Sequence, residues 1–275
     1  MFSITQKEFK QLADYIKANY GINLKEEKKT LVTGRLHHVL TQNKFNNFTE
    51  YYNYIVSDMS GEAVATLLDK ITTNHTFFMR ETNHFYYFRD KILPYLASTV
   101  KQRDLRIWSA GCSSGEEPYT LAMIIDEFFG KEKKWWDAKI LATDISSKVL
   151  DIAAKGLYKN ESIKSLPANW IFNYFNKIDA ENSVIIDRIK NEVIFRKLNL
   201  MDEVFRFKKK FHVIFCRNVM IYFDNNTKQE IVNKFYDLTE PGGYLFIGHS
   251  ESLNRDETKY KYVMPAVYKK GITDI

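Results

Sequence analysis

Residues 107–122 have the sequence IWSAGCSSGEEPYTLA, which is informative about the fold class of the chain. The apolar IWSA predicts a buried strand, Gly111 and Gly115 predict a tight turn, and Pro118 suits the first turn of a helix. A strand, a glycine-containing turn and a helix in this order are typical of ligand-binding α/β domains. The two glycines lack the GxGxxG spacing of dinucleotide-binding folds, so a dinucleotide is not indicated.

The same alternation continues downstream. Strands are expected in LRIWSA, AKILATD, EVIFRKL, FHVIFC and GGYLFIGHS, and helices in EPYTLAMIIDEFF, VLDIAAKGLY and residues 227–238. Residues 105–275 are therefore expected to form a mostly parallel sheet covered by helices, with KYVMPAVYKK as a final strand. Residues 170–196 interrupt the alternation with two strand-like runs around a polar turn and no helix. They predict a small inserted antiparallel β-subdomain.

Residues 1–80 are expected to form an all-α N-terminal domain. Residues 5–8 (TQKE) match a capping box, three apolar residues follow at helical spacing, and Gly21 is a C-terminal stop. Further helices are predicted over residues 24–40, 48–56 and 63–71. A long helix over residues 82–96 lies within a linker at residues 81–104, and Pro94 is expected to bend it or end it early.

The composition favours a globular protein with a large core. The 275 residues include 20 Phe, 17 Tyr and 4 Trp. The N-terminal MFSITQKEF has no apolar run typical of a signal peptide, so a cytoplasmic location is expected. Cys112 and Cys216 indicate no disulfide framework, and the six histidines show no ligand spacing with cysteines or carboxylates, so no metal site is expected. A net charge of +6 suits an acidic partner, nucleic acid or an ordinary solvated surface.

Two adjacent glutamates at the turn indicate which ligand suits it. Glu116 and Glu117 occupy the place where a nucleotide's phosphates usually bind, and a pyrophosphate there would meet like charge. Glutamates also favour the positive end of a helix, but that alone does not explain the glycine-rich loop beside them. A phosphate-free adenosine carrying positive charge explains both features. S-adenosylmethionine has that character, through its sulfonium and α-amino groups.

Asp144 ends the next predicted strand, AKILATD. Because the carboxyl ends of parallel strands meet at one edge of a sheet, its carboxylate is expected near the glycine turn. There it could accept hydrogen bonds from the two ribose hydroxyls of the ligand. The alternative is that Asp144 caps the following helix.

Four segments, ITTNHTFFMRETNHF, IWSAGCSSGEEPYTLA, ATDIS and IFCRNVMIYF, together resemble the CheR-type chemoreceptor glutamate methyltransferases. The resemblance covers nearly the whole chain. It implies an all-α N-terminal domain, then a Rossmann-like S-adenosylmethionine-dependent methyltransferase domain with a small inserted antiparallel β-subdomain. It further implies a cytoplasmic enzyme that methylates glutamate side chains on the helical bundle of methyl-accepting chemotaxis proteins and releases S-adenosyl-L-homocysteine.

The resemblance also implies roles for the matching residues. Asn74, Thr76 and Arg80 reach the cofactor from the interdomain segment, Gly111 belongs to the turn that approaches it, and Glu117 holds its methionine amino end. Asp144 accepts the ribose, Asn199 and Leu200 contact the adenine, and Arg217 and Asn218 lie on the cofactor side. Tyr222 lies toward the acceptor. Taken singly, Arg80 could be a surface charge, Tyr222 a core aromatic, Asn199 a turn residue and Leu200 a packing residue.

Arg80 and Tyr222 are the expected catalytic residues, since both can orient an incoming carboxylate by hydrogen bonds. A glutamate with its ordinary pKa of about 4.3 is already ionised at neutral pH, so no general base is expected. Lys25, Lys28, Lys29 and Arg35 could meet an acidic receptor, or could form a solvated face. In some family members a glycine-containing hairpin binds a receptor tail peptide. Residues 176–182 (NKIDAEN) have no glycine, so tail binding is expected to be absent or weak.

Two other functions compete with receptor methylation. A nucleic-acid methyltransferase is suggested by the pI of about 9.0, but Arg217-Asn218-Val219-Met220 replaces the proline-containing motif of many amino-group methyltransferases. A non-catalytic receptor-binding module is disfavoured because Arg80, Glu117, Asp144 and Tyr222 are all present. We therefore expect neither nucleic acid nor a membrane-inserted segment.

Overall fold

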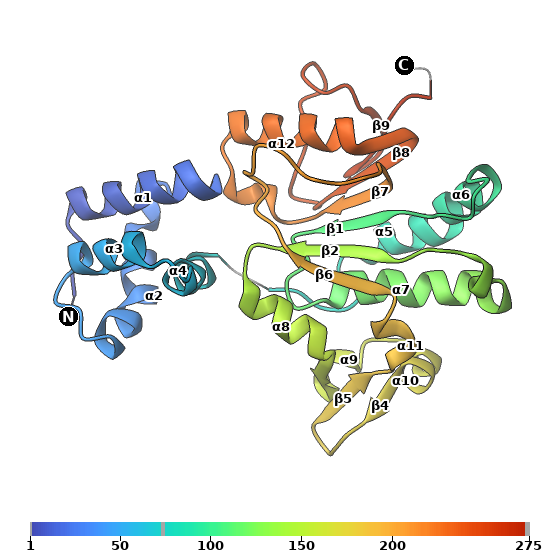
Figure 1. The fold of residues 1–275 in the computed structure, drawn as a ribbon, viewed down its shortest axis with the longest axis horizontal. Helices are drawn as coiled ribbons and strands as arrows, with labels where there is room; N and C mark the ends of the chain where they lie inside the picture. Colours follow the sequence, from blue (N-terminus) through green and yellow to red (C-terminus); the bar gives the residue numbers. More distant parts are fainter. Residues whose placement is uncertain (1, 73–74, 273–275) are drawn as a thin grey trace.

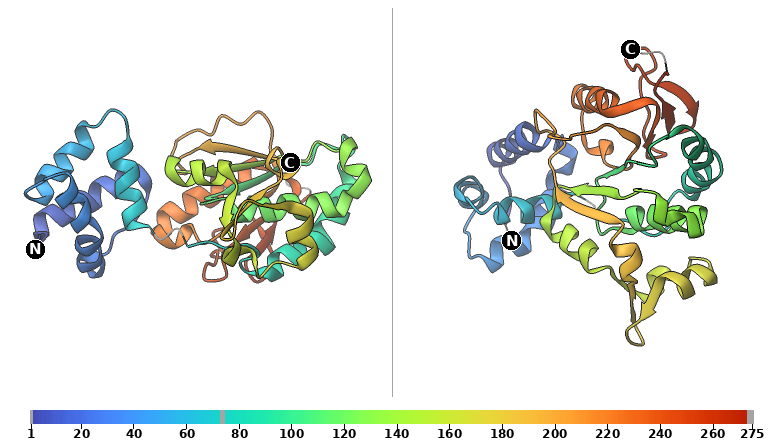
Figure 2. Two further views of the ribbon diagram at one scale, coloured as in Figure 1. Left: turned by 90° about the horizontal axis from the view of Figure 1, so that it is seen from below. Right: turned by 45° about the vertical axis from the view of Figure 1, so that its right-hand side comes forward.

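The structure is a computed structural model that describes residues 2–72 and 75–272. An all-helical N-terminal lobe lies beside a larger α/β domain (Figures 1 and 2). The lobe has its own hydrophobic core. Its elements are α1 Gln6–Tyr20, the 3₁₀ turn η1 Glu26–Lys28, α2 Lys29–Gln42, α3 Phe48–Ser57 and α4 Glu62–Ile71.

The predicted capping box starts α1. Glu8 N donates to Thr5 Oγ1, and Thr5 N donates to the Glu8 carboxylate at 2.9 Å, so two amides at the helix start are satisfied. Gly21, at φ 71°, ends the helix in the left-handed conformation. The prediction of one helix over residues 24–40 is wrong at its start, because the exposed residues 25–28 offer no apolar face and form only η1 before α2.

A seven-stranded sheet in the order β6-β2-β1-β7-β8-β10-β9 forms the centre of the α/β domain. The first five strands pair in parallel, and β10 and β9 complete one edge in antiparallel fashion. The chain passes from β1 to β2 on one side and later to β7 on the other, so the strand order reverses at β1. This topology confirms the Rossmann-like class. The strands are β1 Ile107–Ala110, β2 Ile140–Asp144, β6 Val193–Lys197, β7 Phe211–Cys216, β8 Thr239–Ile247, β9 Lys261–Met264 and β10 Val267–Lys269.

Helices cover both faces of the sheet, with α7 Glu116–Phe129, α8 Ser147–Lys155 and α12 Asn225–Leu238 among them (Figure 1). Successive side chains of β1 point to opposite faces of the sheet, as strand geometry requires. Ile107 packs with α7, and Trp108 packs with α12. The remaining connections include the 3₁₀ turns η3 Gly130–Trp135 and η4 Met220–Tyr222.

The linker forms one long helical stretch. It consists of α5 Thr82–Tyr87, a π-helical turn η2 Phe88–Ile92 and α6 Leu93–Thr99. Pro94 occupies the first turn of α6, where its missing N–H costs little, and the helix continues to Thr99. The prediction that Pro94 ends the helix early is therefore wrong.

Two further predictions need correction. KYVMPAVYKK forms a hairpin of β9 and β10 instead of one strand, with Ala266 at φ 63° in the turn. Residues 170–196 contain helical turns in addition to strands. Trp170 and Tyr174 bury one face of α10 Ala168–Tyr174, a spacing that suits a helix.

The expected antiparallel pairing is nevertheless present in a separate three-stranded sheet, ordered β3-β5-β4. β3 precedes the predicted segment, and β6, at its end, joins the central sheet. The elements of this region are β3 Leu157–Lys159, α9 Asn160–Ile163, β4 Phe175–Lys177, β5 Asn182–Ile185 and α11 Asp187–Lys190.

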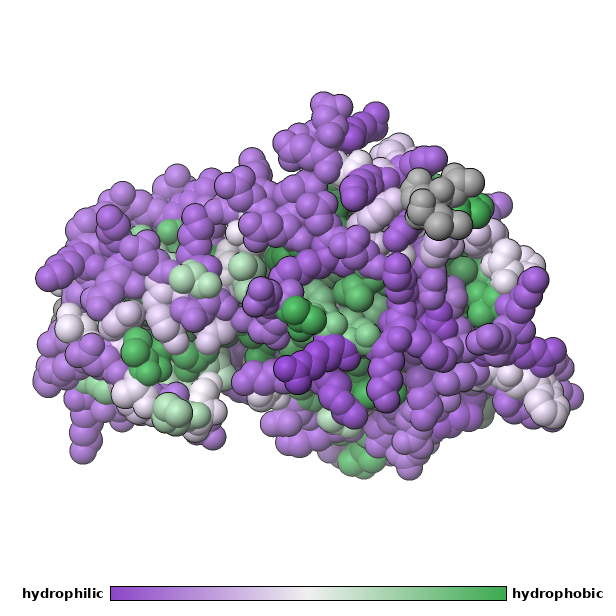
Figure 3. Space-filling view, turned by 45° about the horizontal axis from the view of Figure 1, so that its top comes forward, coloured by the Kyte–Doolittle hydropathy of each residue, from purple (hydrophilic) through white to green (hydrophobic). Residues whose placement is uncertain are grey.

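Hydrophilic side chains cover most of the face seen in Figure 3, and a small group of hydrophobic ones lies in a recess near its centre. Within residues 2–72 and 75–272, no helix combines the length and the apolar character required to cross a bilayer.

Candidate active site

One pocket lies where β1, β2 and β7 end, at the edge of a parallel sheet where ligands bind. Ten of the predicted site residues line this strand-tip pocket, while Asn74 lies outside the described residues. The ten are Thr76, Arg80, Gly111, Glu117, Asp144, Asn199, Leu200, Arg217, Asn218 and Tyr222.

The glycine turn is held tightly against its neighbours. Gly111 N and Cys112 N both donate to the Thr143 carbonyl, at 2.7 and 2.9 Å, which ties the end of β1 to β2. Gly111 has φ 84°, and a Cβ atom there would lie 2.3 Å from Val219 Cγ2. Only glycine therefore allows the turn to approach the loop after β7 this closely.

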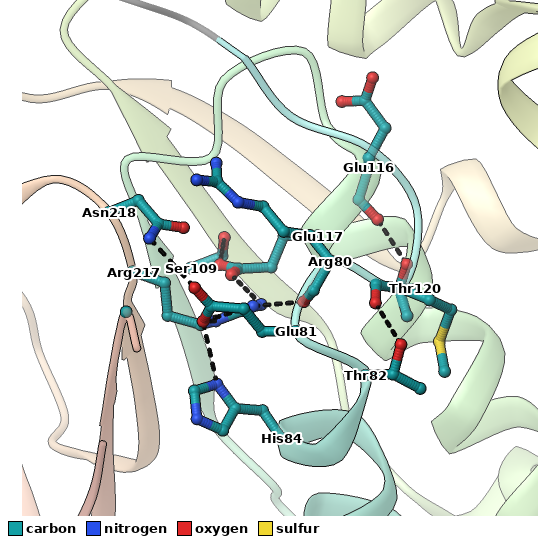
Figure 4. A network of polar contacts seen from close by, with 12 residues as sticks. Arg80, Glu81, Thr82, His84, Ser109, Glu116, Glu117, Thr120, Arg217 and Asn218 are labelled. Carbon is teal, nitrogen blue, oxygen red and sulfur yellow. Dashed lines mark hydrogen bonds and ion pairs between the residues drawn. The ribbon is translucent and has the colours of Figure 1, made fainter. Parts of the chain in front are cut away.

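The two glutamates at the start of α7 have different surroundings. Glu116 accepts a hydrogen bond from Ser114 Oγ at 2.7 Å, and its carboxylate points away from Glu117 (Figure 4). Glu117 faces the pocket, where its two oxygens accept from Ser109 Oγ at 2.7 Å and Arg217 Nη1 at 3.0 Å. Burial raises the pKa of Glu117, and the neighbouring Arg217 guanidinium opposes this effect. A cation entering the pocket would stabilise the ionised form.

Asp144 lies at the tip of β2. Its carboxylate accepts from Ser113 N at 2.9 Å and from Ser146 N at 3.0 Å, so it links the glycine turn to the start of α8. Ser146 provides the N-cap of α8, so the alternative role for Asp144 as that cap does not apply. Burial raises the pKa of Asp144. A partly buried carboxylate at the strand tip fits a ligand that brings hydroxyl donors.

The N-terminal lobe contributes to the pocket, which the sequence did not indicate. Tyr20 and Ile22, at the end of α1, line it beside Asn199 and Leu200. Asn199 Nδ2 donates to the Asn19 carbonyl at 2.7 Å, and Leu200 is 8% exposed. An aromatic ring, two apolar side chains and an amide together suit a planar heterocycle.

Arg217 and Asn218 follow β7 and meet an acidic residue that the sequence did not single out, Glu81 (Figure 4). Arg217 is 3% exposed and pairs with both Glu81 Oε2 and Glu117 Oε2 at 3.0 Å. Asn218 Nδ2 donates to Glu81 Oε1 at 3.2 Å. Glu81 is adjacent to Arg80 in the sequence but 136 and 137 residues from these partners, so no local pattern connects them.

The two predicted catalytic residues reach the pocket from different elements. Arg80 belongs to the interdomain segment, and its Nη1 donates to the His75 carbonyl at 2.6 Å. Tyr222 ends η4, and its carbonyl accepts from Asn23 N of the helical lobe at 2.8 Å. Thr76 lines the pocket near Arg80. Cationic and phenolic groups therefore share one pocket with the carboxylates of Glu117 and Asp144.

Two histidines meet Glu81, although the sequence spacing gave no sign of such a group. The ligand atoms of Glu81, His84 and His249 lie within 4.8 Å of one another. Burial lowers the pKa of His84 to about 3, with a further contribution from Arg217, so His84 is neutral. The Glu81 carboxylate already accepts hydrogen bonds from Arg217, Asn218 and His249 N. We therefore assign no metal to this cluster.

Two family models match consecutive parts of the chain. The CheR methyltransferase all-alpha domain matches residues 7–72, and the CheR methyltransferase SAM binding domain matches residues 74–269. Together with the Rossmann-like sheet and the acidic pocket at its strand tips, these matches define a methyltransferase whose cofactor is S-adenosylmethionine.

Individual relatives are similar in sequence to this chain over nearly its full length. The chain is 45% identical to the chemotaxis protein methyltransferase of Borreliella burgdorferi over 98% of this chain and 96% of the relative. It is 35% identical to a probable chemotaxis protein methyltransferase of Rhizobium etli, over 93% of this chain and 100% of the relative. It is 33% identical to the chemotaxis protein methyltransferase of Escherichia coli, over 97% of this chain and 91% of the relative. The chain belongs to the CheR methyltransferase family.

Proposed function

We propose that this chain transfers a methyl group from S-adenosylmethionine to glutamate side chains of methyl-accepting chemotaxis proteins, forming glutamate methyl esters. The observation that carries the proposal is the division of charge in the strand-tip pocket. Carboxylates of Glu117 and Asp144 line it at the strand tips, and the cationic Arg80 and phenolic Tyr222 approach from other elements. Arg217 also lines the pocket, but its guanidinium is already paired with both Glu117 and Glu81. A cationic donor suits the first pair, and an anionic acceptor suits the second.

Each residue on the donor side has a specific task. Glu117 would accept hydrogen bonds from the α-amino group, and Asp144 from the ribose hydroxyls, while Asn199 and Leu200 would contact the adenine together with the N-terminal lobe. The rest of the pocket lining around the cofactor would come from Thr76, Asn218 and the backbone of Gly111. Asn74 is proposed to join them. When bound, the cofactor supplies an electrophilic methyl group on a sulfonium sulfur.

On the acceptor side, Arg80 and Tyr222 would orient the glutamate carboxylate. One carboxylate oxygen forms a bond to the methyl carbon as the carbon–sulfur bond breaks, and the electron pair of that bond remains on the sulfur. The acceptor is ionised at neutral pH, so no proton has to be removed. Holding both reactants in near-attack geometry can lower the barrier by roughly 7–11 kcal/mol. Binding the carboxylate too tightly in the ground state would raise the barrier again, because only interactions that strengthen in the transition state raise the rate.

The proposed partner is the cytoplasmic helical bundle of the receptors. Lys25 and Lys28 are exposed on the N-terminal lobe and could meet acidic side chains there. Arg35 has a different task, since its Nη1 donates to the carbonyls of Lys70, Ile71 and Thr72 and so caps the end of α4. Lys29 donates to Gln6 Oε1 at 3.1 Å. The basic surface offered to a receptor is therefore smaller than the four residues suggest.

Transfer of a labelled methyl group to receptor-containing membranes tests the proposal. Glutamate methyl esters are hydrolysed by mild alkali and release the label as methanol, whereas methylated amines retain it. We expect alkali-labile label on the receptor, and none when the receptor is absent. Alkali-stable label, or label on added RNA with a steep salt dependence, would contradict glutamate methylation. Donor binding without any transfer would indicate a non-catalytic receptor-binding module.

A further inference from the structure

The backbone on both sides of Arg80 has an unusual conformation. Met79 has φ 60° and Glu81 has φ 57°, so two residues with side chains adopt the left-handed region within three positions. This region is unfavourable for residues other than glycine, and it persists only where the surrounding contacts hold it. The turn that presents Arg80 to the strand-tip pocket is therefore strained.

Thr82 Oγ1 closes this turn locally by donating to the Met79 carbonyl at 2.7 Å, and the side chain of Glu81 ties the turn to the sheet domain. Its Oε2 accepts from Arg217 Nη2 at 3.0 Å, and its Oε1 accepts from Asn218 Nδ2 at 3.2 Å and from His249 N at 3.1 Å. These partners come from the loops after β7 and β8. Figure 4 shows Glu81 between Arg217, Asn218 and His84. One carboxylate thus joins the interdomain segment to two loops of the sheet domain.

Arg217 completes the connection to Arg80. Its Nη2 group donates to the carbonyl oxygen of Arg80 as well as to Glu81. The same guanidinium pairs with Glu117 on the donor side. Burial alone would raise the pKa of Glu81, but Arg217 and the hydrogen bonds from His249 and Asn218 outweigh burial and lower it, so Glu81 stays ionised.

We propose that Glu81 is a positioning residue for methyl transfer, acting through Arg80. Its carboxylate fixes Arg217, and together they hold the strained turn that directs Arg80 toward the acceptor. Glu81 itself is not proposed to touch donor or acceptor; among the residues that the structure describes, it is not part of the pocket lining. The inference rests on the proposed catalytic task of Arg80.

A double-mutant cycle with Arg80 tests the coupling. Glu81→Gln keeps the shape of the side chain but turns an amide N–H₂ toward groups that are themselves donors. On the wild-type background we expect kcat to fall by about 10²-fold, the scale expected for a small misplacement of a catalytic group. On an Arg80→Ala background the same substitution should have far less effect, because its target is already absent. A loss of equal factor on both backgrounds, or no loss on either, would overturn the proposal.

Glu240→Gln is the matched control. It breaks the ion pair of Glu240 with Arg106 (2.7 Å) at the opposite end of the strands. We expect it to change kcat little on either background. If Glu81→Gln does not fold, Glu81→Asp is used in the same cycle, since it keeps the charge and shortens the reach by one methylene. A loss with Glu81→Asp that vanishes on the Arg80→Ala background supports the proposal, and an unchanged or background-independent kcat overturns it.

A crystal structure of Glu81→Gln separates this inference from the proposed function, because it requires no turnover. The expected result is a relaxed turn, with residues 79–81 out of the left-handed conformation and the Arg80 guanidinium displaced from the pocket. A turn and an Arg80 side chain identical to the wild type would overturn the inference while leaving glutamate methylation untouched. Conversely, if the wild-type protein leaves receptors unmethylated, the proposed function fails. The structure of the variant would then still show whether Glu81 positions Arg80.

Discussion

Arg217 Nη1 lies 3.0 Å from Glu117 Oε2. Arg217 directly follows β7 and Glu117 lies in the first turn of α7, so the two residues are 100 positions apart in the chain. The guanidinium is 3% exposed and the carboxylate 13%. The pair therefore joins two loops at the strand tips under nearly complete burial, with Glu81 on the other side of the same guanidinium. On the proposed donor side of the pocket, one guanidinium therefore pairs with both carboxylates.

Removing the guanidinium should destabilise the fold strongly. Arg217→Met leaves two buried carboxylates, Glu81 and Glu117, without their cationic partner, and losing one member of a buried ion pair costs about 3–5 kcal/mol. Urea unfolding should show that loss in the free energy of unfolding. Lys164→Met, which breaks an exposed pair with Glu161, is the control and should change little. Equal stabilities of the two variants would contradict the importance assigned to Arg217.

Donor binding should depend on pH in the acid range. The pKa values of Glu117 and Asp144 are raised above 4.5 and 3.8 by burial, so both carboxylates protonate at higher pH than ordinary ones. A cationic donor prefers the ionised forms, so its affinity should fall as the pH drops through these raised pKa values, by up to about tenfold per unit for each group. Calorimetric titrations between pH 7 and pH 4, in Glu117→Gln as well as wild type, measure this. The dependence should be shallower in the variant.

Without the donor, the contribution of these two carboxylates to stability should respond in the opposite direction. A raised folded-state pKa means that the native protein binds the proton more tightly than the unfolded chain does. The contribution of Glu117 and Asp144 to stability is therefore greatest below their ordinary pKa values and is lost as the pH rises through the raised ones. For donor binding, as opposed to stability, an affinity that stays constant from pH 7 to pH 4 would contradict the donor-side roles of Glu117 and Asp144.

Gly111→Ala should destabilise the glycine turn. A left-handed residue with a side chain costs about 1–2 kcal/mol, and the new Cβ also collides with Val219. Adding Val219→Ala should restore only the steric part. Gly34→Ala is a control of opposite sign, since Gly34 lies within α2 with no atom near its added Cβ, and helical alanine should stabilise by about 0.5–1 kcal/mol. Thermal unfolding and donor binding distinguish these outcomes, and a neutral Gly111→Ala would contradict the close packing.

Tyr222→Phe should lower turnover and leave the donor dissociation constant unchanged. A hydrogen bond to a charged group is worth about 1.5–3 kcal/mol, which corresponds to roughly a 10- to 100-fold loss in kcat. Tyr86→Phe, at a ring that is 46% exposed, is the control. Equal losses of turnover and donor affinity would contradict an acceptor-side role for Tyr222. Arg80→Ala should lose more turnover than Tyr222→Phe.

A peptide from a receptor C-terminus should bind weakly, if at all. The hairpin between β4 and β5 turns without glycine because the Asp179 carboxylate accepts hydrogen bonds from Glu181 N and Asn182 N, both at 2.7 Å. The absence of glycine from this compact turn is the basis for expecting weak or absent tail binding. Calorimetry with a tail peptide tests the prediction directly. Micromolar affinity would show that the hairpin binds the tail without glycine.

Local chemistry explains why much of the fold could be predicted from the sequence. The capping box at Thr5 and the glycine turn at Gly111 act within a few residues, and both appear where their patterns indicate. Trp170 and Tyr174 show the limit of periodicity, because a short apolar run suits a strand or a helix until its packing is known. The turn at Ala266 was missed although Pro265 precedes it, because a proline favours a turn while an alanine does not signal a positive φ.

Most of the candidate site was predictable only because its residues recur in a family motif. Glu117 and Asp144 were also accessible to physical reasoning, since they follow strands whose ends must meet. Glu81 was not, because its partners lie in loops more than 130 residues away. Tyr20 and Ile22 enter the pocket through docking of the N-terminal lobe, which no local pattern in the helical domain encodes.

A crystal structure with S-adenosyl-L-homocysteine would show how the strand-tip pocket holds its donor, on which methyl transfer depends. The predicted result places the ribose hydroxyls at Asp144, the amino group at Glu117 and the adenine between Asn199, Leu200 and the N-terminal lobe. Density for the molecule at any other site, with these side chains making no contact to it, would contradict donor binding in the strand-tip pocket.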